Sequence, residues 1–117
     1  MLAYLRSGKF LICEENGKPV GCVYVEQRGD RAYLGLLSVA PSKQGTGLGR
    51  KLTAAAEEFA SKANCSAMDL RIISARSEAM QPFYEHLGYA VTGTSPPPDS
   101  DGLKMPYHFI HMSKPLA

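Results

Sequence analysis

Three glycines at alternate positions, Gly45, Gly47 and Gly49, divide the sequence into two parts with different hydrophobic periods. Before them, short apolar runs are separated by Asn16-Gly17 and Gly29-Asp30, which predict tight turns between antiparallel strands. After them, apolar residues recur at helical spacing as far as residue 63. The glycines therefore mark the passage from a strand into a helix. The expected strands before it are residues 10–14, 20–26 and 32–39.

The rest of the chain predicts a second, shorter helix and three further strands. A β-rich run covers residues 68–74. Ser77 and Glu78 open a helix expected over residues 79–87, in which Pro82 is awkward unless it lies in the first turn, where a missing N–H costs little. Gly88 is expected as a left-handed C-terminal cap, with Tyr89 packing back onto the helix. The last two strands are expected at 89–92 and 107–112, joined by a loop over 94–106. A helix between the third and fourth strands favours parallel pairing there, so the order predicts a mixed α/β sheet.

Composition limits the class of protein. The chain has 117 residues, of which 44% are hydrophobic and 21% charged, the ordinary mix of one folded domain, expected here over residues 1–117. A formal charge of +2 gives no electrostatic reason to expect nucleic acid or an anionic membrane as a partner. No apolar run approaches the roughly 20 residues of a spanning helix, and the first residues lack the pattern of a signal peptide. A soluble, cytoplasmic protein is predicted.

The cysteines and histidines give no indication of a disulfide framework or a metal site. Cys13, Cys22 and Cys65 form an odd, sparse set that fits a reducing compartment, so buried or half-buried thiols are expected. The alternative is a bridge between Cys13 and Cys22, which are expected on neighbouring strands and could meet if the hairpin register placed them opposite each other. No zinc-ligand spacing is present. We predict no metal.

The glycine run has the physical properties of a phosphate-binding loop. Its backbone N–H groups lead directly into a helix N-terminus, where free donors and the helix dipole favour an anion. Lys43, Arg50 and Lys51 add positive charge nearby. The spacing fits neither a P-loop nor the dinucleotide fingerprint, because Arg50 stands where the latter needs glycine. The alternative is a glycine-rich turn that only caps the helix.

Two segments resemble a known family. Gln44-x-x-Gly47-x-Gly49 is similar to the acetyl-CoA signature [Q/R]-x-x-G-x-[G/A] of the GNAT superfamily of N-acetyltransferases, and the segment 77–89 resembles that superfamily's N-x-x-A-x-x-[LF]-Y-x-x-x-G-[FY] motif. Ser77 and Met80 depart from the second motif. The resemblance implies a splayed, mixed β-sheet flanked by helices, here without the superfamily's first strand and two helices. Either a short natural form or a truncated sequence would account for this.

The resemblance also implies the cofactor-binding residues. The acetyl and pantetheine groups of acetyl-CoA are expected along the third strand, at a bulge, and the pyrophosphate at the glycine run. Ser77 is expected to contact the cofactor. The full predicted set is Leu37, Ser38, Val39, Gln44, Gly45, Thr46, Gly47, Leu48, Gly49, Arg50 and Ser77.

In this superfamily the acceptor amine attacks the thioester directly, and two proton transfers need side chains or water. Tyr84 matches the tyrosine that serves as general acid, the alternative being a packing role in the core or against pantetheine. Glu26 is one candidate base and a water relay is the other; an isolated carboxylate on a strand is usually solvated. The hypothesis is acetyl transfer to a primary amine of a small molecule or peptide.

Two questions about partners follow. Asp99 and Asp101 could attract a cationic acceptor, although a loop of this composition is more often only solvated. The alternative function is a CoA-binding regulatory module without acceptor chemistry. Because the expected first strand is absent, the sheet edge near residues 10–14 would expose backbone donors and apolar surface, which favours a homodimer.

Overall fold

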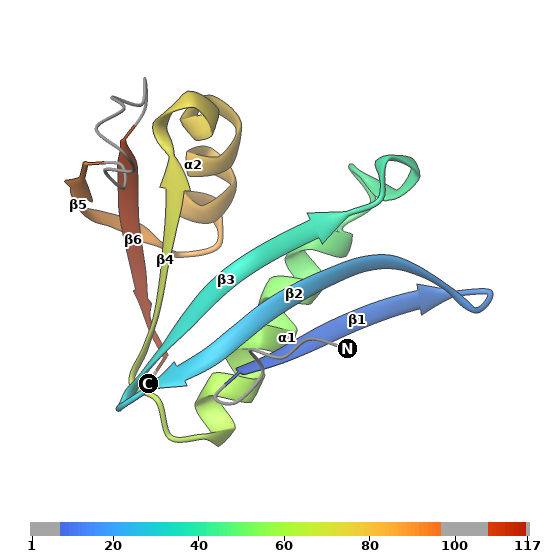
Figure 1. Ribbon diagram of the computed structural model, residues 1–117, viewed down its shortest axis with the longest axis horizontal. Coiled ribbons are helices and arrows are strands. Elements are labelled where there is room, and N and C mark those ends of the chain that lie inside the picture. Colours follow the sequence, from blue (N-terminus) through green and yellow to red (C-terminus); the bar gives the residue numbers. More distant parts are fainter. Residues whose placement is uncertain (1–7, 97–107, 117) are drawn as a thin grey trace, which may run out of the picture. The chain divides into compact units, whose positions relative to one another are not determined.

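The computed structural model describes residues 8–96 and 108–116, and its contacts divide the chain into two compact units. The first unit contains the described residues up to 68 together with 115 and 116, and the second contains residues 69–114. Each unit combines strands with one α-helix (Figure 1). The predicted α/β class is thereby confirmed, and the two units are described in turn. No helix in the described ranges is long and apolar enough to cross a membrane.

The first unit begins with three antiparallel strands, β1 (Gly8–Glu15), β2 (Lys18–Arg28) and β3 (Arg31–Val39). Asn16 and Gly17, with φ of 55° and 78°, form the first turn, and Gly29, with φ of 67°, lies in the second. Positive φ at both central residues gives a turn whose twist matches that of the strands it joins. Both predicted hairpins are confirmed, and each strand is longer than its apolar run.

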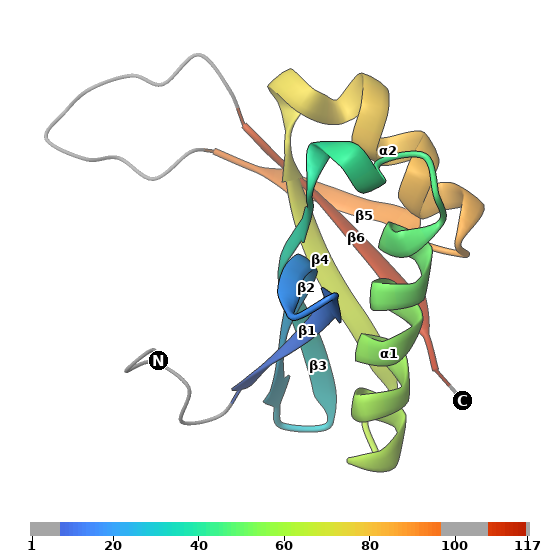
Figure 2. The same ribbon diagram turned by 90° about the vertical axis from the view of Figure 1, so that its right-hand side faces the viewer.

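The helix α1 (Leu48–Lys62) covers one face of these strands (Figure 2). A short 3-10 turn, Pro41–Lys43, follows β3 and leads into the glycine loop before α1. Val23 and Val25 on β2 and Ala56 and Ala60 on the helix are fully buried and form the core of the unit. Gly21 permits the close approach, because a Cβ there would lie 2.9 Å from the Leu52 Cδ1 atom. A larger residue at position 21 would require the Leu52 side chain to move.

A β-bulge interrupts the pairing of β2 with β3. Tyr24 pairs with Leu36 and Val25 with Leu34, so Gly35 is the extra residue. A Cβ on Gly35 would lie 2.8 Å from the Tyr24 ring, which explains why a residue without a side chain stands there. Leu36 is turned to the face opposite α1 and is 47% exposed.

The second unit contains the strands β4 (Ala67–Ile73), β5 (Ala90–Ser95) and β6 (Phe109–Pro115), in the spatial order β4-β6-β5. The first residues of β4 and the end of β6 belong to the first unit. β5 and β6 are antiparallel. Residues 94 and 95, expected in a loop, extend β5; the rest of that predicted loop from residue 97, and the predicted strand residue Tyr107, lie outside the described residues.

The helix α2 (Ser77–His86) follows β4 through a 3-10 turn, Ser74–Arg76. The expected cap is confirmed, because Gly88 has φ of 101° and the Tyr89 N–H donates to the Tyr84 carbonyl at 3.0 Å. Pro82 lies inside the helix and not in its first turn, so it occupies the position that the sequence marks as awkward for proline. Proline has no N–H to donate four residues back, to the carbonyl of Glu78, and that exposed residue can be served by water instead.

Candidate acetyl-CoA site

The predicted phosphate-binding loop runs from the end of β3 into the N-terminus of α1. Gly47 precedes the helix with φ of 88°, and no side chain caps the helix there. The first intrahelical bond is donated by the Lys51 N–H to the Gly47 carbonyl, at 3.1 Å. The N–H groups of Leu48, Gly49 and Arg50 consequently have no acceptor within the helix. These donors, at the positive end of the helix dipole, can bind an anion.

The loop leaves room for such an anion. Gly45 has φ of 82°, and a Cβ added at Gly45 or Gly47 would meet no atom within 4 Å. The loop itself is held by local bonds, from the Gln44 side chain to the Val39 carbonyl at 3.4 Å and from the Thr46 hydroxyl to the Lys43 carbonyl. Two glycines in left-handed backbone thus face open space beside free N–H groups, which fits a diphosphate.

Charge at the loop is positive but less than the sequence indicates. Arg50 and Lys51 are exposed in the first turn of α1, and that turn contains no acidic residue. Lys43, expected to add its charge to the phosphate site, instead pairs with Glu15 at 2.6 Å. That ion pair fastens the loop to the end of β1 and largely cancels the charge of the lysine.

The third-strand part of the predicted site lies directly before this loop. Leu37, Ser38 and Val39 pair in regular register with residues 23, 22 and 21 of β2. The expected bulge is present in the strand, but it falls at Gly35 and not at Leu37–Val39 as expected. The reason is local, since a Cβ at position 35 would lie 2.8 Å from the Cδ2 atom of the Tyr24 ring, so that a residue without a side chain fits the bulge there. The first unit thus holds together all the predicted cofactor residues except Ser77.

Ser77 and Tyr84 belong to the second unit. The Ser77 hydroxyl donates to the Ser74 carbonyl at 2.9 Å, a bond that joins the first turn of α2 to the preceding 3-10 turn. Tyr84 is 3% exposed and lies edge-on between Phe83 and Tyr89, with ring centroids 5.0 and 5.7 Å away. Burial raises the pKa of Tyr84 to about 12. The phenol therefore stays protonated at neutral pH and can serve as a proton donor.

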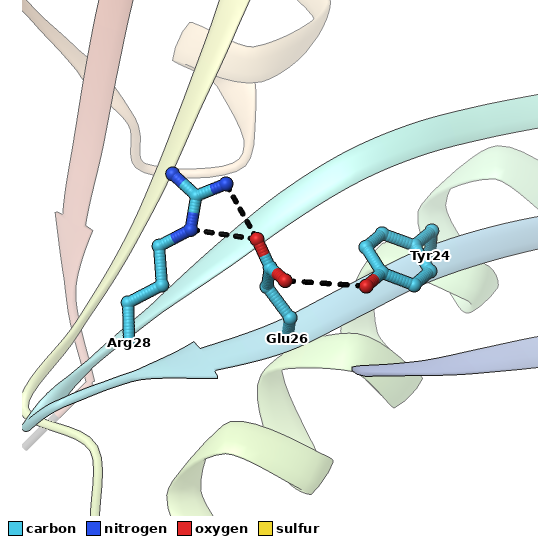
Figure 3. A network of polar contacts seen from close by, with 3 residues as sticks. All are labelled: Tyr24, Glu26 and Arg28. Atoms are coloured by element: carbon cyan, nitrogen blue, oxygen red, sulfur yellow. Dashed lines mark hydrogen bonds and ion pairs between the residues drawn. The ribbon is translucent and has the colours of Figure 1, made fainter. Parts of the chain in front are cut away.

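Glu26 is not the isolated, solvated carboxylate that the sequence indicated. It accepts hydrogen bonds from the Tyr24 hydroxyl at 3.2 Å and from Arg28 Nε at 2.6 Å (Figure 3). The Arg28 guanidinium in turn lies over the Tyr33 ring at 4.1 Å. All these residues lie within the first unit, on the two strands that carry the bulge. Their alternation along β2 is visible in the sequence, but the pairing of their side chains depends on the folded register.

Among the described residues, no three potential metal ligands cluster. Cys13 pairs with Gly21 and Cys22 with Ile12, so the two cysteines are not opposite each other, and all three cysteines are free thiols. Burial raises the pKa of the Cys65 thiol, and the nearby Asp30 carboxylate adds to this. The expectation of free, buried or half-buried thiols is confirmed.

A family model described as an acetyltransferase (GNAT) domain matches residues 2–115. The chain belongs to the GNAT acetyltransferase family, and the resemblance stated from the two motifs is confirmed.

Solved structures show the same fold. Nourseothricin acetyltransferase matches with a TM-score of 0.84 at 23% identity, covering 96% of this chain and 67% of its own. The ribosomal-protein-S18-alanine N-acetyltransferase from Escherichia coli matches at 0.79 and 24%, covering 96% and 71%. PaiA N-acetyltransferase from Thermoplasma acidophilum, solved with coenzyme A, matches at 0.74 and 21%, covering 93% and 61%. At these identities the likeness establishes the fold.

Proposed function

We propose that this chain is an acetyl-CoA-dependent N-acetyltransferase that acetylates a primary amine of a small molecule or peptide. The observation that supports this most is the uncapped N-terminus of α1. Three N–H groups without intrahelical acceptors follow two glycines that face open space, and exposed Arg50 stands in the same turn. Cationic side chains at a helix N-terminus oppose the helix dipole, so an anionic ligand is what this arrangement stabilises.

Different predicted residues would bind different parts of acetyl-CoA. The glycines and the N–H groups of Leu48 to Arg50 would hold the pyrophosphate, and the backbone along Leu37 to Val39 would receive the pantetheine and the acetyl group. Acetyl-CoA supplies an activated thioester, so the reaction forms a C–N bond and breaks a C–S bond without a protein nucleophile. The chain's own task is to bind, to orient the acyl group and to move two protons.

Tyr84 is proposed as the group that protonates the departing thiolate. It matches the tyrosine of the superfamily's second motif, and its pKa of about 12 keeps the proton on the phenol at working pH. The amine must lose a proton before or during attack. Because the Glu26 carboxylate already accepts bonds from Tyr24 and Arg28, we favour a water relay over Glu26 as the base.

The first test is binding of acetyl-CoA by calorimetric titration, with melting as a second readout. A ligand at one hundred times its dissociation constant stabilises the native state by about 2.7 kcal/mol, a readily measured shift in melting temperature. Gly47→Glu should abolish binding, because its side chain fills the open space with a like charge. Gly29→Glu is the matched control, since Gly29 also has positive φ and an open Cβ position but lies in the β2–β3 turn. Equal affinity in all three proteins would mean that the loop only caps the helix.

The second test measures release of free thiol from acetyl-CoA with a panel of polyamines, amino acids, aminoglycosides and peptides, with products read by mass spectrometry. Acetylated product with at least one amine supports the transferase. Tight binding with no product from any amine would contradict it and would favour the non-catalytic CoA-binding module.

A further inference from the structure

The second unit places an arginine and a histidine side by side on the face of its strands opposite α2. The Ser74 N–H donates to the His108 carbonyl at 2.8 Å, and the Ser113 hydroxyl donates to Asp69 at 2.9 Å. From Ser74 to Asp69 the chain goes back five residues, and from His108 to Ser113 it goes forward five. The strands β4 and β6 are therefore antiparallel, with Ser74 opposite His108 and Asp69 opposite Ser113. Arg71 falls opposite His111 in that register, with Cβ atoms about 5 Å apart.

The Arg71 guanidinium is exposed and already oriented. It lies over the Phe109 ring, 4.2 Å from the centroid, and no carboxylate in the described ranges pairs with it. Asp69, on the same face of β4, is engaged by the Ser113 hydroxyl. A guanidinium that is stacked on an aromatic ring loses little freedom on binding, and its planar donors match a carboxylate in a bidentate manner.

The neighbouring histidine is oriented as well, and one side of it is open. The Ser95 hydroxyl lies 2.7 Å from His111 Nε2, which fixes the half-buried ring. Gly93 is the residue paired with His111 on β5, and a Cβ there would meet no atom within 4 Å. Arg71, His111 and Gly93 therefore form a row across the three strands, with two nitrogen-bearing side chains beside a space that none of the described side chains fills.

From this row we infer that Arg71 and His111 bind the carboxylate of the acceptor, which makes the acceptor an amino acid or a peptide that presents its carboxylate. The inference rests on the proposed acetyltransferase function and names its substrate class. A guanidinium beside an imidazole disfavours a cationic ligand group and favours an anionic one. Phe109, lying under Arg71, offers an apolar surface for the rest of such an acceptor.

The test compares amino acids with their C-terminal amides, which keep the amine and lose the carboxylate. For the wild type, kcat/KM should be at least tenfold higher for the acids. Arg71→Ala should lower kcat/KM for the acids by about 10- to 100-fold, the loss expected for a charge-assisted bond, and leave the amides unchanged. For Arg71→Lys, kcat/KM for the acids should lie between the values of the wild type and of Arg71→Ala, because lysine keeps the charge but lacks the planar fork of donors. Arg76→Ala is the control, an exposed arginine in the same unit.

Equal rates for acids and amides in the wild type would overturn the inference, and so would an unchanged preference in Arg71→Ala. A loss of acetyl-CoA affinity in that variant would overturn it too, by assigning Arg71 to the cosubstrate. If no amine is acetylated, the proposed function fails and the site is judged by NMR. The His111 imidazole signals should then move when glycine is added and stay fixed with glycinamide. No movement with glycine, or equal movement with inorganic phosphate, would contradict a carboxylate site.

Discussion

Tyr84 carries the sharpest prediction at the scale of a single residue. Tyr84→Phe keeps the packing against Phe83 and Tyr89 and removes only the hydroxyl. If the phenol donates a proton to the thiolate, turnover should fall by about 10²-fold or more while acetyl-CoA affinity stays nearly unchanged. With a pKa of about 12, the wild-type acid keeps its proton throughout pH 7 to 10, so no loss of activity in that range should be due to Tyr84.

Steady-state kinetics with a cosubstrate titration measures this. Tyr89→Phe is the matched control, because Tyr89 is also 3% exposed and belongs to the same aromatic cluster. Similar turnover in both variants would reduce Tyr84 to a packing residue. Lost affinity without a further loss of turnover would make it a contact for pantetheine instead.

Residues whose role depends on backbone conformation could be predicted from the sequence. Gly17 and Gly88 have the positive φ that their turn and cap positions required, and Gly47 leads into the helix as expected. Side-chain partners that depend on how two strands or segments are aligned could not be predicted from the sequence. The pairing of Lys43 with Glu15 and of Arg71 with Phe109 joins residues far apart in the chain, and neither partner is indicated by local sequence.

At the scale of the element, α1 has a positive charge at its N-terminus, where a positive charge destabilises an isolated helix. Arg50 stands in the first turn and opposes the helix dipole, whereas Lys62 in the last turn complements it. Arg50→Ala should therefore raise the free energy of unfolding of the ligand-free protein by about 0.3 to 1 kcal/mol. The same change should weaken acetyl-CoA binding, because the arginine is proposed to face the pyrophosphate.

Denaturant unfolding with and without acetyl-CoA measures both the predicted gain in stability of the ligand-free protein and the predicted loss of acetyl-CoA binding. Lys62→Ala is the control, since removing that cation should lower stability slightly and leave binding unaltered. An Arg50→Ala protein that is less stable without ligand, or that binds acetyl-CoA as the wild type does, would contradict a functional reason for the arginine.

Elements were predictable in kind and order because turn chemistry and hydrophobic period are local signals. The exceptions have identifiable causes. Pro82 lies inside α2 because the helix already begins at Ser77, so that its first turn ends before the proline. The bulge fell at Gly35, and a glycine inside a strand is the signal that could have placed it.

At the scale of the whole molecule, the family match spans both units, from residue 2 to residue 115. The proposed cofactor residues lie in the first unit, except for Ser77, while Ser77, Tyr84 and the Arg71–His111 pair lie in the second. Asp99 and Asp101, expected to attract a cationic acceptor, lie outside the described residues. The acid-against-amide comparison tests the opposite charge preference for the acceptor.

Self-association is the prediction that belongs to the whole molecule. On the face of the first unit opposite α1, Ile12 is 53% exposed and Leu36 is 47% exposed, on the two strands that flank β2. Among the described strands, β1 pairs only with β2 and so presents an edge. Exposed apolar side chains beside an open edge favour pairing with a second copy.

We therefore expect the apparent mass in light scattering to rise with protein concentration towards that of a dimer. Ile12→Lys should shift the protein towards monomer, because a charged residue on an edge strand opposes pairing. Val91→Lys is the control, since Val91 is 43% exposed but lies on β5 in the second unit. A wild-type protein that stays monomeric at high concentration would contradict the prediction of self-association. A dimer that Val91→Lys dissolves while Ile12→Lys does not would place the interface on β5 instead.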